Sequence, residues 1–291
     1  MQGWTYTAIA ALAWSLAPLF AFGLAGDSIV RACGRLPIGV RLVLPVLFGV
    51  PYALAGIAPA SGRWLAFYFS VPVLLAVLLW HAKQSDPEQR GDWRDFAILL
   101  ILGMAVDLRW LDPAWPAHLS VIGKLILLDS GLYGFLVIRQ LSDVGFDLRI
   151  RGGDIGVALR ELLFYAPLAL LLGLALEFLH LHAGLPRPGT AGLTVLGTFF
   201  LIAIPEEIYF RGWMQNLLER RLGRMGSLFL TSAIFGLSHF NKRTVNFNWR
   251  YVLLAAIAGV FYGRAWRQGH RVAASAITHA SVDTIWSLWL R

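Results

Sequence analysis

The sequence predicts an all-α fold, a polytopic transmembrane helical bundle of about 8–10 spans. Of its 291 residues, 57% are hydrophobic and only 14% are charged, and the mean hydropathy is +0.63. A soluble domain carries about 25% charged residues, so this chain has too few charges to cover a soluble globule. Intrinsic disorder, a soluble nucleic-acid-binding domain and a disulfide scaffold are excluded, the last because Cys33 is the single cysteine.

Ten apolar segments are long enough, or nearly long enough, to cross a hydrocarbon core about 30 Å thick. They are residues 4–25, 41–58, 64–81, 96–111, 119–138, 156–180, 191–217, 226–239, 251–263 and 272–290. The first has no basic stretch before it and no clear cleavage site, so we interpret it as a retained helix and not as a signal peptide. Pro45, Pro51 and Pro72 fall inside the second and third segments, where we expect kinks. The fourth, eighth and ninth segments are short.

The basic residues indicate how the spans are oriented, because loops on the inner face of a membrane carry more Lys and Arg. If the N-terminus lies outside, the inner loops are residues 26–41, 82–95, 139–155, 218–225 and 264–271, and each carries three basic residues. This alternation predicts that both ends of the chain lie outside. It also explains the net charge of +8 without a nucleic-acid partner. The exception is the loop 240–250, which is basic on the predicted outer side through Lys242, Arg243 and Arg250.

Ionisable residues inside the last four segments indicate a functional site, because a charge at bilayer depth is costly. Residues four apart share a helix face, and three such pairs occur in order along these segments. They are Glu207 with Arg211, Phe235 with His239, and His279 with Asp283; Glu206 precedes the first pair. At about 1.5 Å per residue, these groups fall within one slab of the membrane. We therefore predict a single polar cluster.

The predicted cluster contains the parts needed to hydrolyse a peptide bond without a covalent intermediate. A buried carboxylate beside a histidine can activate water as a general base and then act as an acid. A second histidine backed by a carboxylate can stabilise an oxyanion. Pro205 cannot donate a hydrogen bond to the carbonyl of Leu201, so we expect a kink that makes room for water just before Glu206.

The three motifs resemble those of the CPBP intramembrane proteases, which include the CAAX prenyl endopeptidases of the Ras-converting-enzyme type and bacteriocin-processing relatives. The resemblance covers residues 190–290. It implies that Glu206 is the catalytic carboxylate, that His239 helps it to activate water, and that His279 and Asp283 stabilise the oxyanion. The family often has Asn where this chain has Asp283. Supporting, structural roles are implied for Glu207, Arg211 and Phe235.

The resemblance leaves metal dependence open, since the family has been described both as glutamate-dependent and as metalloproteases. Glu206, His239 and His279 would be the ligands of a divalent metal such as zinc. The sequence has no His-Glu-x-x-His helix. We therefore favour a glutamic-type enzyme with no cofactor.

These observations predict two parts: residues 1–155, an N-terminal transmembrane extension of about five to six helices, and residues 156–291, a catalytic core ending in four helices. We expect a multi-pass protein of a bacterial inner membrane. Its expected partners are the lipid bilayer and a membrane-associated protein or peptide substrate, such as a prenylated tail, a C-terminal sorting signal or a leader peptide. No nucleic acid is expected.

Three alternative functions are weighed against this interpretation. A catalytically silent CPBP-like protein could act in immunity or as a scaffold. A membrane transporter could use the same charges as a proton or ion path, but those charges would be spread over several depths. A serine protease could use Ser238 with His279, but the residue after Ser238 is not the glycine expected of rhomboid-type motifs.

Overall fold

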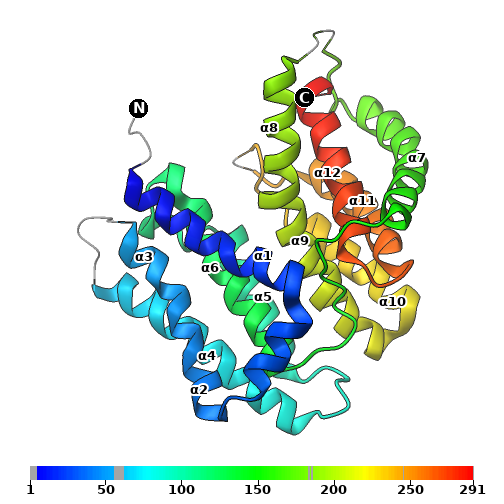
Figure 1. The fold of residues 1–291 in the computed structure, drawn as a ribbon. Helices are drawn as coiled ribbons and strands as arrows, with labels where there is room; N and C mark the ends of the chain where they lie inside the picture. The colour runs from blue at the N-terminus through cyan, green and yellow to red at the C-terminus, as the bar shows by residue number, and fades with distance from the viewer. Residues whose placement is uncertain (1–4, 56–61, 183, 185, 245, 291) are drawn as a thin grey trace. The chain divides into compact units, whose positions relative to one another are not determined.

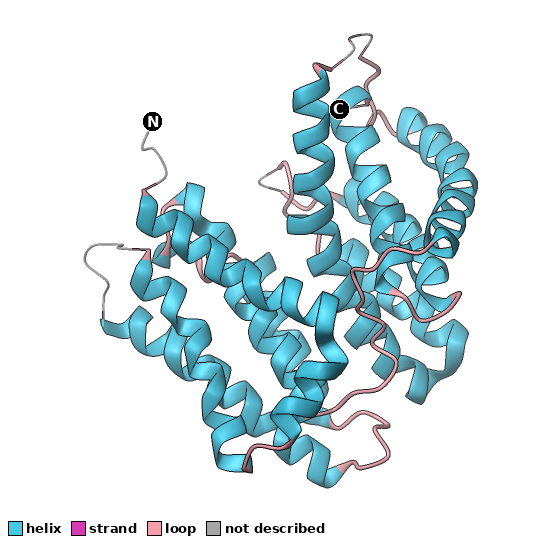
Figure 2. Ribbon diagram, in the orientation of Figure 1, coloured by secondary structure: helices cyan, strands magenta, loops and turns pink. Residues whose placement is uncertain are grey.

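The computed structural model describes residues 5–55, 62–182, 184, 186–244 and 246–290. Every regular element in these ranges is helical, which confirms the predicted all-α fold (Figures 1 and 2). Five helices in the described part are long and apolar enough to cross a membrane, as expected for a polytopic bundle. The contacts divide the chain into two compact units, Met1–Ser142 and Asp143–Arg291.

The first unit contains α1 (Tyr6–Gly34), α4 (Gly62–Ser85), α5 (Trp93–Asp107) and α6 (Ser120–Tyr133), which continues into the wide turn η4 (Gly134–Ile138). Helix α6 packs against both α1 and α4, and nearly all of its side chains are buried. Apolar side chains on α1, α4 and α5 are in contrast partly exposed, as expected for helices that face lipid.

The second predicted span, residues 41–58, corresponds in its described part to one apolar helical stretch, Ile38–Leu54. The hydrogen-bond pattern changes along it, so that it comprises α2 (Ile38–Val43), η1 (Leu44–Gly49) and α3 (Val50–Leu54). Pro45 lies in the first turn of η1, and Pro51 lies in the first turn of α3. Because proline has no N–H to donate, the pattern changes close to each of them. Pro72, in contrast, lies inside a continuous α4.

The second unit contains α7 (Gly152–Ala175), α8 (Pro188–Thr198), α9 (Ile204–Glu207), α10 (Asn216–Leu237), α11 (Trp249–Arg267) and α12 (Val272–Trp289). Helix α11 packs against α10, α12 and α7, and α12 also packs against α7 and α8. Gly223 interrupts α10 with a positive φ of 69°, a conformation that glycine adopts without strain, and so separates the predicted seventh and eighth spans.

The segment before α7 packs with the second unit. Arg271 makes ion pairs with Asp147 and Asp154, and the N–H of Val272 donates to the carbonyl of Gly145. The contact division therefore falls between Ser142 and Asp143. The domain boundary predicted from the sequence lies slightly later, between residues 155 and 156.

A buried ion-pair cluster holds the end of the first unit together. The guanidinium of Arg139, which has no exposed surface, lies 3.0 Å from Asp95 and 2.6 Å from Asp86. Asp95 is also fully buried. Leaving such a charge unpaired is strongly destabilising, whereas an exposed pair contributes little.

We predict that Asp95→Ala lowers the free energy of unfolding by about 3–5 kcal/mol, because it leaves Arg139 buried with one partner fewer. Thermal unfolding of the purified chain in detergent measures the effect. Glu88→Ala, which removes the exposed pair between Glu88 and Arg90, is the matched control and should leave the midpoint unchanged. Equal effects of the two variants would contradict the role of the cluster.

Candidate active site

The helix that carries Glu206 and Glu207 has an unusual backbone. The short α-helix α9 lies between two stretches with wider π-helical turns, η5 (Phe199–Ala203) and η6 (Ile208–Gln215). Pro205 lies in the first turn of α9, where its missing N–H requires no partner within that helix. Wide turns of this kind are rare and are frequent at functional sites. The kink expected at Pro205 therefore takes the form of wider helical turns on both sides of it.

The predicted pair of Glu207 and Arg211 is confirmed. Nε of Arg211 lies 3.3 Å from a carboxylate oxygen of Glu207, and neither side chain has exposed surface. Arg211 also donates a hydrogen bond of 3.1 Å to the backbone carbonyl of Gly259 in α11. Burying these charges is costly unless they are paired. Through the hydrogen bond from Arg211 to Gly259, the buried pair also connects η6 to α11.

Glu207 also holds His279, a contact that the sequence analysis did not predict. Nδ1 of His279 lies 2.8 Å from Oε1 of Glu207, and the hydroxyl of Ser275 donates to the other oxygen. The ring of Tyr262 is stacked on the imidazole, with centroids 4.6 Å apart and planes 14° apart. Ser275 lies four residues before His279 and therefore on the same face of α12, which is the signal that could have identified it. For Tyr262 no such pattern exists.

Two further carboxylates lie at the opposite edge of the His279 ring. Oδ2 of Asp283 is 3.5 Å from Nε2, as the predicted shared face of α12 requires, and Oε2 of Glu206 is 3.9 Å from the same nitrogen. Their side chains are 30% and 35% exposed, respectively, whereas that of Glu207 is fully buried. Oε2 of Glu206 has no hydrogen-bond partner. Glu206 is therefore a carboxylate within the cluster that can still accept a hydrogen bond.

His239 lies beside this group and is held by its own helix turn. Its Nδ1 is 2.8 Å from the carbonyl oxygen of Phe235. A carbonyl can only accept, so Nδ1 carries a proton, and Nε2 of the neutral ring keeps its lone pair. Within the described residues, neither a hydrogen bond nor an ion pair joins His239 to Glu206.

Phe235 is the aromatic centre around which these residues pack. It is 2% exposed. Its ring lies 5.0 Å from the ring of His239 and 5.6 Å from that of His279, while the guanidinium of Arg211 lies 4.9 Å from its centroid. One side chain of α10 thus contacts both histidines and the buried cation, which gives the predicted supporting residue a packing role.

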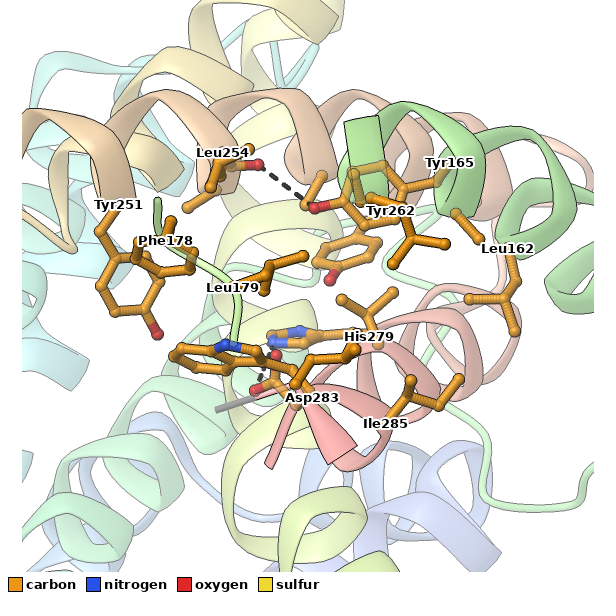
Figure 3. Close-up of a pocket in the computed structure, with 18 of the residues that line it drawn as sticks. Leu162, Tyr165, Phe178, Leu179, Tyr251, Leu254, Tyr262, His279, Asp283 and Ile285 are labelled. Carbon is orange, nitrogen blue, oxygen red and sulfur yellow. Dashed lines mark hydrogen bonds and ion pairs between the residues drawn. The ribbon is translucent and has the colours of Figure 1, made fainter. Parts of the chain in front are cut away.

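An apolar cavity of about 140 Å³ opens beside the cluster (Figure 3). Its walls come from α7, α11, α12 and the segment after α7, and include Leu162, Tyr165, Leu179 and Trp286. Three polar groups of the cluster also line it, namely His239, His279 and Asp283. The cavity is therefore an apolar space whose wall includes three of the candidate catalytic side chains.

The described side chains do not fit a metal site built from Glu206, His239 and His279. No group of three or more His, Cys, Asp or Glu side chains in the described part has a metal-binding arrangement. Nδ1 of His279 is 2.8 Å from Oε1 of Glu207, and its Nε2 is 3.5 Å from Oδ2 of Asp283, so both ring nitrogens face a carboxylate oxygen. A metal would need a free lone pair on one of them.

A protein-family model matches the C-terminal part of the chain. Residues 188–285 match the model of the family described as type II CAAX prenyl endopeptidase Rce1-like. The match covers about a third of the chain, and this part is therefore similar to an Rce1-like domain. Its extent includes every predicted catalytic residue, from Glu206 to Asp283, which confirms the resemblance to the CPBP proteases. Helix α7 lies before the Rce1-like domain, although it supplies part of the cavity wall. No curated protein and no solved structure matches the chain.

Close packing of α10 on α11 positions the Rce1-like site, and Gly236 permits it. A Cβ at this glycine would lie 2.5 Å from the carbonyl oxygen of Val252 and 2.6 Å from Cβ of Ala256. We predict that Gly236→Ala lowers the unfolding midpoint, because backbone cannot move as a flexible side chain can.

The matched control is Gly156→Ala in α7, where an added Cβ meets no protein atom within 4 Å. It should be neutral or stabilising, since alanine favours a helix over glycine by about 1 kcal/mol. Thermal unfolding of both variants checks the pair. A Gly236→Ala midpoint equal to that of the unsubstituted chain would contradict the packing account.

Proposed function

We propose that this chain is an intramembrane endopeptidase that hydrolyses a peptide bond of a membrane-associated protein or peptide by a water that Glu206 activates. The Rce1-like family implies a protease that acts in a membrane, and the helices are apolar enough for that setting. The observation that carries the proposal is the position of Oε2 of Glu206, which lies 3.9 Å from Nε2 of His279 and accepts no hydrogen bond within the described residues, whereas the carboxylate of Glu207 is bound by Arg211, His279 and Ser275.

In the proposed reaction, Glu206 accepts a proton from a water that also donates a hydrogen bond to Nε2 of His239. The hydroxide attacks the carbonyl carbon of the scissile bond, and the negative charge moves to the carbonyl oxygen. Glu206 then returns the proton to the leaving nitrogen as the C–N bond breaks, giving a carboxylic acid and an amine. No group on the chain becomes covalently modified.

His279 and Asp283 are proposed to stabilise the oxyanion. Glu207 binds Nδ1 of His279, so the imidazole presents its Nε2 side to the site. Asp283 lies 3.5 Å from Nε2 and supports a proton on that nitrogen. Preorganised donors of this kind contribute much of the rate of acyl-transfer enzymes. Glu207 and Arg211 act through His279 and are positioning residues.

The serine alternative has weaker support in the geometry. The hydroxyl of Ser238 donates a 2.8 Å hydrogen bond to the carbonyl of Phe235, and within the described residues no hydrogen bond joins it to His279. A nucleophilic serine needs a base that can accept its proton. The transporter alternative requires charges along a path, whereas here they meet around one imidazole.

We predict that Glu206→Gln reduces peptide-bond cleavage by at least about 10²-fold, because the amide cannot accept a proton from water. Comparing the termini of membrane proteins in cells with and without this chain identifies the cleaved product, whose yield then measures each variant. Ser238→Ala is the matched control and should retain activity. Full activity of Glu206→Gln would exclude the proposed mechanism, and loss of activity in Ser238→Ala alone would support the serine alternative.

We also predict that prolonged dialysis against a zinc chelator leaves the cleavage rate unchanged, since the described donor set does not fit a metal. The same product yield is measured before dialysis, after it, and after zinc is added back. Loss of activity that zinc restores would show that the enzyme is metal-dependent.

A further inference from the structure

Two basic side chains of the first unit have no acidic partner. Arg41 lies in the last turn of α2 and Lys83 in the last turn of α4, and both belong to predicted inner loops. No carboxylate in the described residues lies within ion-pair distance of either charge. Arg139, in the same unit, is in contrast paired with Asp86 and Asp95. This end of the unit therefore carries positive charge that its own acidic residues do not neutralise.

Contacts between helices hold the two cations near each other. The hydroxyl of Tyr133, at the end of α6, donates a 2.9 Å hydrogen bond to the backbone carbonyl of Arg41. The ammonium of Lys83 donates a 2.6 Å hydrogen bond to Oε1 of Gln140, the second residue after η4. Helix α2 packs against α4 (Figure 1), and Arg41 is close enough to Lys83 to act on its charge. Like charges held in this way repel each other unless an anion lies between them.

The guanidinium of Arg41 is incompletely satisfied by the protein. Its Nε is enclosed by protein atoms and has no hydrogen-bond partner. The side chain makes neither a hydrogen bond nor an ion pair with any described residue. A buried charged donor without a partner is costly. Since the residue as a whole is partly exposed, an anion can reach the guanidinium from outside and offset that cost.

The surroundings of Arg41 indicate the kind of anion. Val40, Val43 and Leu47, on the same stretch of α2 and η1, are 47%, 58% and 46% exposed. Exposed apolar side chains at the end of a membrane unit suit the acyl chains of a lipid. A phospholipid matches both the charge and the apolar surface, whereas a free phosphate matches only the charge. Basic pockets on the cytoplasmic side of membrane proteins bind anionic head groups in this way.

We propose that Arg41 and Lys83 bind the phosphate group of an anionic phospholipid in the inner leaflet, with its acyl chains along α2 and η1. The site lies in the first unit, outside the residues that match the protein-family model. It is therefore independent of the proposed function. It gives the N-terminal unit a task of its own, which is to hold the chain to the anionic face of the membrane.

Lipid titration tests the proposal. The full-length chain, purified in detergent without added lipid, is mixed with phosphatidylglycerol or with phosphatidylcholine of the same acyl chains. Native mass spectrometry measures the fraction that carries one lipid. We expect phosphatidylglycerol to bind about tenfold more tightly, because the two cations repel the choline ammonium. Equal binding of the two lipids would overturn the proposal.

Variants distinguish a specific site from general attraction to a basic surface. Arg41→Gln with Lys83→Gln should reduce the preference to about twofold or less, since both charge-assisted contacts are lost. Arg31→Gln with Arg35→Gln removes two exposed charges from the same inner loop and should retain the preference. Equal losses in the two double variants would overturn the site. If the first double variant does not fold, Lys83→Gln alone decides, because glutamine can still pair with Gln140: a reduced preference supports the site, and an unchanged one overturns it.

Inorganic phosphate separates a lipid from a soluble anion. At the same concentration as phosphatidylglycerol it should displace none of the bound lipid, because it lacks the acyl chains. Displacement that requires Arg41 and Lys83 would assign the site to free phosphate and overturn the lipid proposal. Cleavage is not measured in any of these titrations, so a chain without hydrolase activity gives the same results.

Discussion

The candidate site depends on one fully buried carboxylate, that of Glu207. Arg211, His279 and Ser275 all contact it, and they come from η6 and α12. Unpaired, this charge would be among the most unfavourable groups in an apolar bundle, so the helices that carry its partners are held in one arrangement. Through the bond from Arg211 to the carbonyl of Gly259, the same constraint extends to α11. The partly exposed carboxylates of Glu206 and Asp283 lie at the Nε2 edge of the imidazole that Glu207 holds.

Aromatic packing helps to fix the orientation of the histidine rings, which the ion pairs alone do not determine. His279 has Tyr262 stacked on one face and the edge of Phe235 against it, with interplanar angles of 14° and 90°. Rotation of the imidazole would therefore lose both the stack and the bond to Glu207. His239 is fixed by the carbonyl of its own helix turn, which leaves its second nitrogen for the site. Different contacts thus orient the two histidines. The carboxylate of Glu207 holds the ring of His279, and the backbone carbonyl of Phe235 holds the ring of His239.

Helical periodicity predicted which side chains lie on the same face of a single helix. It predicted that Glu207 pairs with Arg211 and that His279 shares a face with Asp283, and the structure brings the members of each pair to within 3.3 Å and 3.5 Å, respectively. It could not predict which face meets which, because contacts between helices depend on crossing angles and on small residues such as Gly236 and Gly259. Tyr262 and the contact of Glu207 with His279 were missed for that reason. The cavity was missed as well, since Tyr165 and Leu179 line it from α7 and from the segment after it, regions without a polar pattern.

The second predicted span shows a related limit of sequence patterns. Hydropathy averaged over residues 41–58 cannot show where the hydrogen-bond pattern of the helix changes, although Pro45 and Pro51 lie in the first turns of η1 and α3. The basic loop 240–250 is the exception to the predicted orientation, and its described residues show where two of its charged residues lie. The backbone N–H of Lys242 donates to the carbonyl of His239, and the guanidinium of Arg243 lies 3.9 Å from the ring centroid of Trp286. The composition of a loop cannot predict such contacts, because they depend on how the chain folds back after α10.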